Sequence, residues 1–290
     1  MNWLILQLVA MTIGAANGVL DKWLDRRNLN NPRLFLASFA VVSLPVALIG
    51  IITHPFITRA ALIGLTSGLC FSGAVVLYYR AVAVESIVRL TLPGRLIAVI
   101  SLPLNALILQ ERVSAVQVIA FVLMLAGGWL LTVEWGGIGN RRPTRGFWLM
   151  LGVEALYMFQ DVLKNVLATQ YDAWMMLTWE RSGIVLGALL VLAHRRDRME
   201  LSSTFSRMSG RLRLLLLGKP AAHLIMGLLF GLAVQLAGVA TNVIIAGGAY
   251  PLIVTALAWL TFNKQPRSRC CRETFIGVLG ALVGICLLIF

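Results

Sequence analysis

The chain has 290 residues, of which 59% are hydrophobic and 13% are charged, and its mean hydropathy is +0.85. A soluble domain of this size needs far more polar surface to stay dissolved. The net charge of +13 would suit a nucleic-acid ligand, but the basic residues lie in short segments between long apolar blocks. We therefore expect a protein embedded in the lipid bilayer that binds no nucleic acid.

Ten apolar blocks, each close to the roughly 20 residues that a helix needs to cross hydrocarbon, follow one another along the chain. They run over residues 3–20, 34–52, 60–79, 90–109, 113–133, 146–167, 173–193, 221–244, 248–262 and 274–290. No charged residue lies between Pro220 and Asn263, but a single helix of that length would measure about 66 Å, twice the hydrocarbon core. Gly247, Gly248 and Pro251 provide a break, so the sequence predicts ten transmembrane helices.

The loops between these spans differ in charge. The odd-numbered loops contain 20 of the 25 Lys and Arg residues, and basic loops are retained in the cytoplasm. We therefore expect a multi-pass protein whose odd-numbered loops are cytoplasmic and whose termini lie outside. The longest of these loops, 195–219, has seven basic residues. Its segment 201–217 either lies flat on the inner leaflet or is a solvated loop.

The two halves of the chain repeat each other weakly. Positions in the fifth span match positions in the tenth, with Gln117 on Glu273, Gly128 on Gly284 and Leu131 on Leu287. Each half then has five spans, and an odd number of spans per repeat places the halves in opposite orientations. The predicted fold class is thus an all-α integral membrane protein with two inverted five-helix repeats. Its domains are a first repeat over 1–135, a basic cytoplasmic linker over 136–145 and a second repeat over 146–290.

Residues 79–131 resemble the drug/metabolite transporter superfamily, in particular its ten-helix EamA-like branch. The matching features are an alanine-rich end of the third span at 81–84, Pro103 in the fourth span, a Glu-Arg turn at 111–112 and an Ala-Gly pair at 126–127. Gln110 stands where the family usually has glycine. The resemblance implies alternating access between the halves, export as the commoner direction, and the inner (plasma) membrane of a bacterium. Members usually have cytoplasmic termini, whereas the charge pattern here predicts the reverse.

The sixth span has the densest set of ionisable residues. Glu154, Tyr157, Asp161 and Lys164 follow at intervals of three, four and three residues, which puts them on one face of a helix. Ionisable side chains within spans usually face a cavity or a partner. We therefore expect this face to line a central cavity, with Tyr157 and Asp161 contacting substrate. Lys164 lies near the outer interface and is interpreted as snorkelling there.

Glu154 lies about two turns into the first helix of the second half. The small multidrug resistance branch of the superfamily has its proton- and substrate-binding glutamate at a comparable point of its first helix. The resemblance therefore implies that Glu154 exchanges a proton against substrate, since burial favours the neutral form of a carboxylate. The alternative is a structural salt bridge from Glu154 to Arg95, Lys164 or Arg181.

Arg95 and Gln235 are the other candidate substrate contacts. Arg95, about one turn into the fourth span, offers a planar fork for a carboxylate or phosphate; the alternative is that it pairs with Glu154 or Asp161. Gln235 is singled out because Gly227 and Gly231 allow its helix to approach its neighbours closely.

The remaining polar and small residues within spans are interpreted as contacts between helices. The polar ones are Arg181, Gln7, Asn17, Asn105 and Asn242. Glycine pairs such as Gly64 and Gly68 indicate tight packing and leave a homodimer open. The tyrosines at the end of the third span, Tyr78 and Tyr79, are interpreted as part of an aromatic belt.

Signatures of enzymes and metal centres are missing from the sequence. It contains no G-x-S-x-G elbow, no H-E-x-x-H pair and no glycine loop for nucleotides. The four cysteines have neither metal-site spacing nor the pattern of a disulfide framework. We expect no enzymatic activity, no cofactor and no metal.

These observations predict a secondary transporter that exports a small polar metabolite and draws on a proton or substrate gradient. The substrate is expected to be anionic or zwitterionic if Arg95 faces the cavity. Two alternatives stay open. One is a flippase or carrier of a lipid-linked or nucleotide sugar, which a cavity opening sideways to lipid would favour. The other is a non-transporting membrane subunit that scaffolds a partner.

Overall fold

The computed structural model describes residues 2–25, 31–53, 58–84, 100, 103–104, 106–110, 112–132, 145–193, 201, 204–238, 240–247, 250, 253, 256–257 and 283. Over these residues the chain is helical and contains no strand. The helices are α1 (Asn2–Asp25), α2 (Pro32–Thr53), α3 (Arg59–Val84), α5 (Ala115–Thr132), α6 (Arg145–Gln170), α7 (Ala173–Val191), α9 (Gly210–Ala237) and α10 (Ala240–Ala246).

Five of these helices are long and apolar enough to cross a bilayer: α2, α3, α7, α9 and the part of α1 over Asn2–Asp21. With 26 residues, α6 is about 39 Å long at the rise of an α-helix, but its charged residues lower its hydropathy. These helices fit an integral membrane protein, as the composition predicts. The predicted spans at 90–109, 248–262 and 274–290 lie almost wholly outside the described residues.

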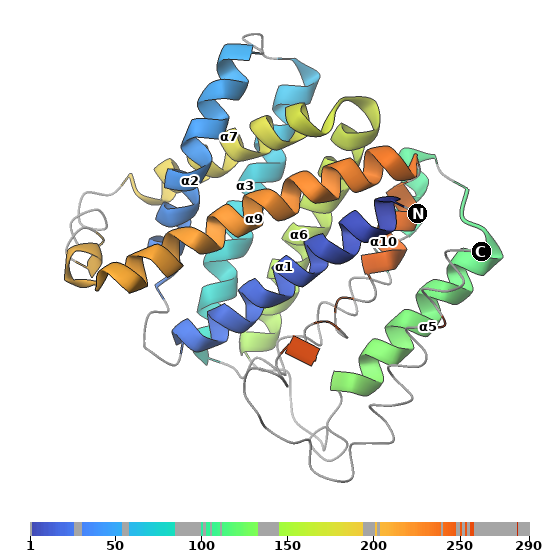
Figure 1. Ribbon diagram of the computed structural model, residues 1–290, viewed down its shortest axis with the longest axis horizontal. Coiled ribbons are helices and arrows are strands. Elements are labelled where there is room, and N and C mark those ends of the chain that lie inside the picture. Colours follow the sequence, from blue (N-terminus) through green and yellow to red (C-terminus); the bar gives the residue numbers. More distant parts are fainter. Residues whose placement is uncertain are drawn as a thin grey trace.

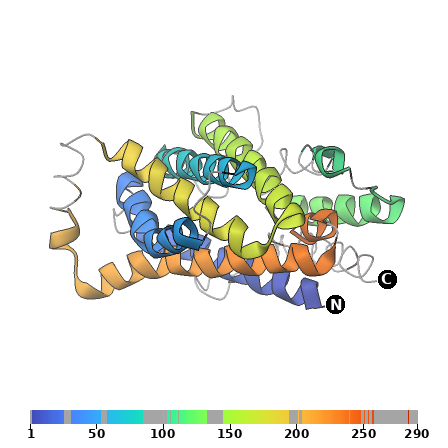
Figure 2. The same ribbon diagram turned by 90° about the horizontal axis from the view of Figure 1, so that it is seen from above.

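The helices are arranged around α3, which packs against α6 along one side and against α7 along another. Helix α2 packs against α7, and α1 runs alongside α9 in both views (Figures 1 and 2). Helix α9 also contacts α2, α6 and α7. As a result, one face each of α3, α6, α7 and α9 is directed towards a shared interior, where most of the buried polar side chains lie.

Glycines bring α3 and α7 into backbone contact. A Cβ atom added to Gly68 would lie 2.1 Å from the carbonyl oxygen of Glu180, and one added to Gly64 would lie 2.3 Å from Cβ of Trp179. On the facing helix, a Cβ on Gly183 would lie 2.3 Å from the carbonyl oxygen of Leu65. The tight packing predicted from Gly64 and Gly68 is therefore confirmed, and it holds Glu180 in the interior.

Side-chain and glycine caps set several helix ends. Ser114 and Gln117 form a capping box at α5, with Ser114 N donating to Gln117 Oε1 at 2.8 Å and Gln117 N donating to Ser114 Oγ at 3.2 Å. Asp172 caps α7 by accepting a hydrogen bond from Met175 N at 2.7 Å. Gly238 ends α9 in the left-handed conformation, with φ of 66°.

Gln110 has a left-handed backbone, with φ of 55°, a conformation that costs a side-chain-bearing residue about 1–2 kcal/mol. A glycine could adopt this conformation without strain.

The predicted start of the eighth span is wrong. The sequence placed it after Pro220, because Lys219 is the last basic residue before a long uncharged stretch and was counted with the loop. Helix α9 instead begins at Gly210 and runs through Pro220. The segment 210–217 is therefore neither a surface helix on its own nor a solvated loop, and Lys219 is a buried residue of the bundle.

Candidate functional site

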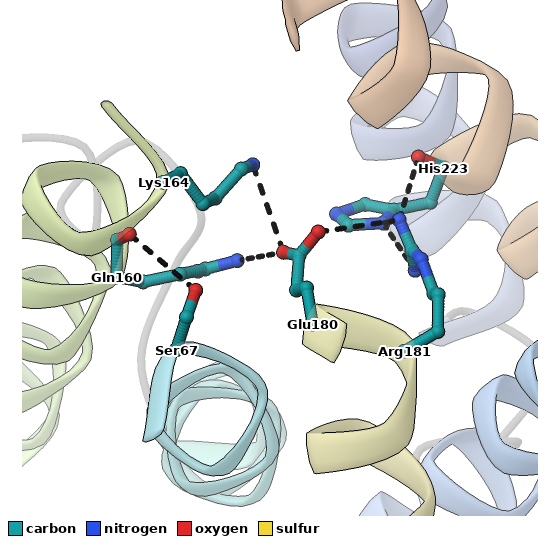
Figure 3. A network of polar contacts seen from close by, with 6 residues as sticks. All are labelled: Ser67, Gln160, Lys164, Glu180, Arg181 and His223. Carbon is teal, nitrogen blue, oxygen red and sulfur yellow. Dashed lines mark hydrogen bonds and ion pairs between the residues drawn. The ribbon is translucent and has the colours of Figure 1, made fainter. Parts of the chain in front are cut away.

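A network of buried polar side chains lies in the interior where α3, α6, α7 and α9 meet (Figure 3). At its centre is Glu180, whose side chain is fully buried. Gln160 Nε2 donates a hydrogen bond to Glu180 Oε1 at 2.8 Å, and Lys164 Nζ lies 3.7 Å from the same oxygen. Ser67 Oγ donates to the carbonyl oxygen of Gln160 at 3.5 Å. We call these residues, together with Arg181 and His223, the central network.

Arg181 extends the central network to α9. Its Nη2 lies 3.9 Å from Glu180 Oε2, which is an ion pair too long for a hydrogen bond. The guanidinium instead contacts His223, with Nη1 and Nη2 each 3.3 Å from Nδ1 and with Nη2 donating to the carbonyl oxygen at 3.3 Å. Arginine keeps its proton, so Nδ1 is the acceptor and the imidazole is neutral with its proton on Nε2.

The central network binds four helices together through charge. One carboxylate, Glu180, lies between two cations, Lys164 and Arg181, and none of the three is accessible to solvent to a significant extent. Removing one partner of a buried ion pair leaves an uncompensated charge and costs about 3–5 kcal/mol. Within the described residues, Glu180 Oε2 and Arg181 Nε have no hydrogen-bond partner. The central network therefore connects helices through paired charges, although two of its polar atoms lack a hydrogen bond.

The structure brings together three of the residues predicted on the sixth span. Glu154 and Tyr157 are half-buried and Asp161 is exposed, and the carboxylates of both acids act electrostatically on the Tyr157 hydroxyl. The Tyr157 ring lies 6.2 Å from the ring of Phe71 on α3, so this face of α6 is directed towards the bundle. We call Glu154, Tyr157 and Asp161 the α6 polar face.

Lys164 does not snorkel to the interface, and that interpretation is wrong. Its side chain is buried and belongs to the central network, and its ammonium also lies 5.0 Å from the ring centroid of Phe230 on α9. Burying a lysine costs free energy unless its charge is paired, and Glu180 supplies that partner. The sequence had offered Lys164 and Arg181 only Glu154 as a possible ion-pair partner, and it assigned no partner to Glu180.

Of the other two predicted contacts, Arg95 lies outside the described residues, and Gln235 is not brought to the α6 polar face. The side chain of Gln235 is exposed, and its Nε2 donates to the carbonyl oxygen of Tyr171 between α6 and α7 at 3.4 Å. Gln235 lies 12 residues beyond His223, or about 18 Å along α9. As described, Gln235 makes a contact between helices.

The amides interpreted as contacts between helices make such contacts wherever they are described. Gln7 Nε2 donates to the carbonyl oxygen of Val243 at 3.4 Å, Asn17 Nδ2 donates to that of Lys219 at 3.5 Å, and Gln117 Nε2 donates to Asn242 Oδ1 at 2.6 Å. Asn105 lies outside the described residues.

A second buried cluster of charge was missed by sequence reasoning. Lys219 on α9 contacts Asp21 Oδ1 and the Tyr79 hydroxyl, and the Tyr79 hydroxyl donates to Asp21 Oδ1 at 2.7 Å. Tyr79 is 3% exposed, so its interpretation as an aromatic-belt residue is wrong. Asp21 lies just beyond the predicted first span and Lys219 just before the predicted eighth. Both residues were therefore expected to lie in loops.

The described cavity is separate from these clusters. It is a groove of about 420 Å³ lined by Ala16, Val19, Leu20, Trp23, Leu215 and Leu257, mainly on α1 and α9. Its lining has no ionisable side chain. Among the described residues no group of three His, Cys, Asp or Glu side chains could hold a metal ion.

Comparison with known proteins identifies a fold without a function. No protein-family model matches the chain, and no curated protein does. Of 27 matching chains of solved structures, one crystal structure of a protein has a TM-score of 0.63, 14% identity, and coverage of 97% of this chain and 98% of its own. At that identity the likeness shows a shared fold alone. The resemblance to the drug/metabolite transporters stays a prediction.

Proposed function

We propose that this chain is a secondary transporter that exports a small polar metabolite by alternating access between two inverted five-helix repeats. The proposal includes ten spans, with repeats over 1–135 and 146–290 joined by the linker 136–145, cytoplasmic odd-numbered loops and outside termini. Support comes from the apolar helices of the described part, the repeat in the sequence and the carboxylates on α6. A membrane helix with a polar face must turn that face towards protein or water.

The observation that carries the proposal is the electrostatic setting of Glu154. Lys164 and Arg181, two of the three cations that could have neutralised it, pair with Glu180 instead. Glu154 is half-buried near Tyr157, none of the ion pairs in the described part of the chain includes it, and the carboxylate of Asp161 lies near enough to act on it. A carboxylate in such surroundings exchanges a proton more readily than one held in a salt bridge. Glu154 is therefore the proposed coupling residue.

The substrate is proposed to contact the α6 polar face. Tyr157 offers a hydroxyl and a ring, and Asp161 offers an exposed carboxylate on the same face. Arg95 is proposed as the contact for an anionic group of the substrate. Gln235 is proposed to line the pathway near the α6–α7 connection, where it bonds Tyr171.

The test is mass spectrometry of spent medium from cells expressing the wild type, Glu154→Gln, Arg95→Ala or an empty vector. We expect a metabolite enriched outside only with the wild type. Glu154→Gln should abolish proton-driven export, because the amide cannot take up and release a proton. Asp172→Asn is the matched control, since it makes the same chemical change at an exposed helix cap where Asn caps as well as Asp.

The outcomes separate the candidates. Export by Glu154→Gln that still responds to pH would contradict the coupling role. If alanine at Glu154 and Arg95 left the cellular phenotype of the chain intact and no metabolite were exported, the scaffold alternative would replace the transporter.

The apolar groove favours one second candidate, a flippase or carrier of a lipid-linked sugar. Its lining on α1 and α9 suits an acyl or polyprenyl chain better than a polar metabolite. Ala16→Trp would fill the groove without touching the α6 polar face. This variant should block movement of a lipid-linked substrate and leave metabolite export unchanged, and the reverse result would exclude the second candidate.

A further inference from the structure

The ammonium group of Lys219 lies in a cage made by three other helices. Its Nζ contacts the carboxylate of Asp21 on α1 and the hydroxyl of Tyr79 on α3. It also lies 4.8 Å from the ring centroid of Phe35 on α2 and 5.0 Å from that of Tyr79. The two rings are stacked with centroids 4.1 Å apart and planes inclined by 5°. We call Asp21, Phe35 and Tyr79 the ammonium cage.

The cage is built into the core. Phe35 and Tyr79 belong to the largest cluster of buried apolar residues in the described part, and Asp21 is 8% exposed. The carboxylate is oriented by the Tyr79 hydroxyl at 2.7 Å, so its position is set by a group other than the lysine. The stacking of the two rings and the hydrogen bond from Tyr79 to Asp21 do not involve the lysine.

The cage has the chemistry of a receptor for an organic ammonium ion. A carboxylate neutralises the charge, a carboxylate oxygen and a phenolic oxygen accept N–H hydrogen bonds, and the stacked rings of Phe35 and Tyr79 form an apolar wall beside the cation. Lys219 therefore resembles a ligand attached to the chain.

The backbone beside Lys219 can bend. Pro220 is the next residue and lies inside α9, where proline has no N–H for the carbonyl four residues earlier and is a usual place for a helix to kink. The carbonyl oxygen of Lys219 accepts a hydrogen bond of 3.5 Å from Asn17 on α1, a long contact that breaks readily. A bend of α9 at this point would withdraw the ammonium from the cage and leave the carboxylate and the rings in place.

We propose that the cage formed by Asp21, Phe35 and Tyr79 binds a small primary ammonium compound, and that Lys219 occupies it as a tethered competitor. Its two hydrogen-bond acceptors favour a primary ammonium group over a quaternary one. Binding at the cage does not depend on transport. That the bound compound is also the transported substrate, an amine or a zwitterion with a primary amino group, rests on the proposed function.

The test is equilibrium binding of labelled methylammonium to the purified full-length chain in detergent. The wild type should bind it saturably and weakly, because only the fraction of molecules with Lys219 withdrawn is competent. Lys219→Ala, which removes the competitor, should bind at least about tenfold more tightly. The double variant Asp21→Asn, Lys219→Ala should lose binding, and tetramethylammonium should compete poorly because it donates no hydrogen bond.

Each outcome decides. If the wild type shows no saturable binding, the proposal is overturned even if Lys219→Ala binds, since the cage would then serve only to hold the side chain of Lys219. Equal binding by the double variant also overturns it. Lys219→Gln keeps an uncharged donor for Asp21 and so competes more weakly than lysine; its affinity should fall between those of the wild type and Lys219→Ala, and it serves as the readout if the alanine variant does not fold.

A second measurement separates the cage from the transporter. Uptake of labelled methylammonium into proteoliposomes is compared between the wild type and Asp21→Asn. Binding in detergent without uptake would count against transport of the amine and leave the cage intact. Export of another metabolite from cells without methylammonium binding would support the transporter and overturn the cage.

Discussion

The central network and the α6 polar face share one helix and differ in how their charges are satisfied. In the central network, Glu180 has a cation on each side and a hydrogen bond from Gln160. On the α6 polar face, Glu154 lies beside Tyr157 and is influenced by a second carboxylate, Asp161. In the described part, the first arrangement joins helices through paired charges, whereas in the second no ion pair includes Glu154.

This difference follows from helix packing. Helices α3 and α7 approach to backbone contact at Gly68 and Gly183, which leaves no gap between these two helices beside Glu180. On the α6 polar face, Glu154 lies almost three turns from Lys164. Asp161 is less than one turn from Lys164, whose charge acts on it, but its side chain is exposed. Charge in the tightly packed region is structural, and charge in the accessible region can take part in binding.

The largest effect is expected from Glu180→Ala. The variant leaves Lys164 and Arg181 as uncompensated buried cations, which costs about 3–5 kcal/mol. We expect a strongly lowered yield of folded protein and a lower melting temperature in detergent. Asp172→Asn, a change of acid to amide at an exposed cap, should melt like the wild type. An unchanged melting temperature for Glu180→Ala would contradict the structural role of the central network.

A smaller loss is expected from Gly68→Ala. The new Cβ would lie 2.1 Å from the carbonyl oxygen of Glu180, so α3 and α7 must separate, at a cost of about 1–3 kcal/mol. Gly218→Ala is the matched control, because a Cβ there meets nothing within 4 Å and alanine favours a helix over glycine by about 0.5–1 kcal/mol. The melting temperature should thus fall for Gly68→Ala and rise for Gly218→Ala. A shift in the same direction for both variants would exclude close packing as the cause.

Hydropathy was sufficient to predict most of the described helices, because each apolar block buries its backbone polar groups internally. The second span was predicted over 34–52 and α2 runs over Pro32–Thr53. Tight packing at Gly64 and Gly68 was also predictable, since small residues four apart form a flat helix surface, but the helix that they contact was not. The spacing placed Glu154, Tyr157, Asp161 and Lys164 on one face of a helix, whereas Lys164 is buried in the central network. That this face lines a cavity stays a prediction.

Partners of charged residues could not be predicted, because pairing is a property of the tertiary structure. Asp21 and Lys219 are 198 residues apart in the chain, and each lies at the edge of a predicted span, where a charge usually faces water. Pro220, directly after Lys219, stood at the boundary of the predicted eighth span. Lys164 was predicted to snorkel to the interface because its charge partner, Glu180, lies on α7 and not on the polar face of α6.

The smallest change in stability, and the sharpest test of the comparison, is expected from Glu154→Gln. The amide fills the same space, and Glu154 takes no part in the ion pairs of the central network, so the free energy of unfolding should change by less than about 0.5 kcal/mol. Glu180→Gln, the same substitution at a fully buried residue of the central network, should melt well below it, because it removes a buried charge from between two cations. Melting curves for the two variants, recorded together with the export assay, distinguish a carboxylate that stabilises the fold from one that takes part in transport. If both variants lost the same stability, Glu154 would be structural, and proton coupling would have to be assigned to another acid, with Asp161 the next to examine.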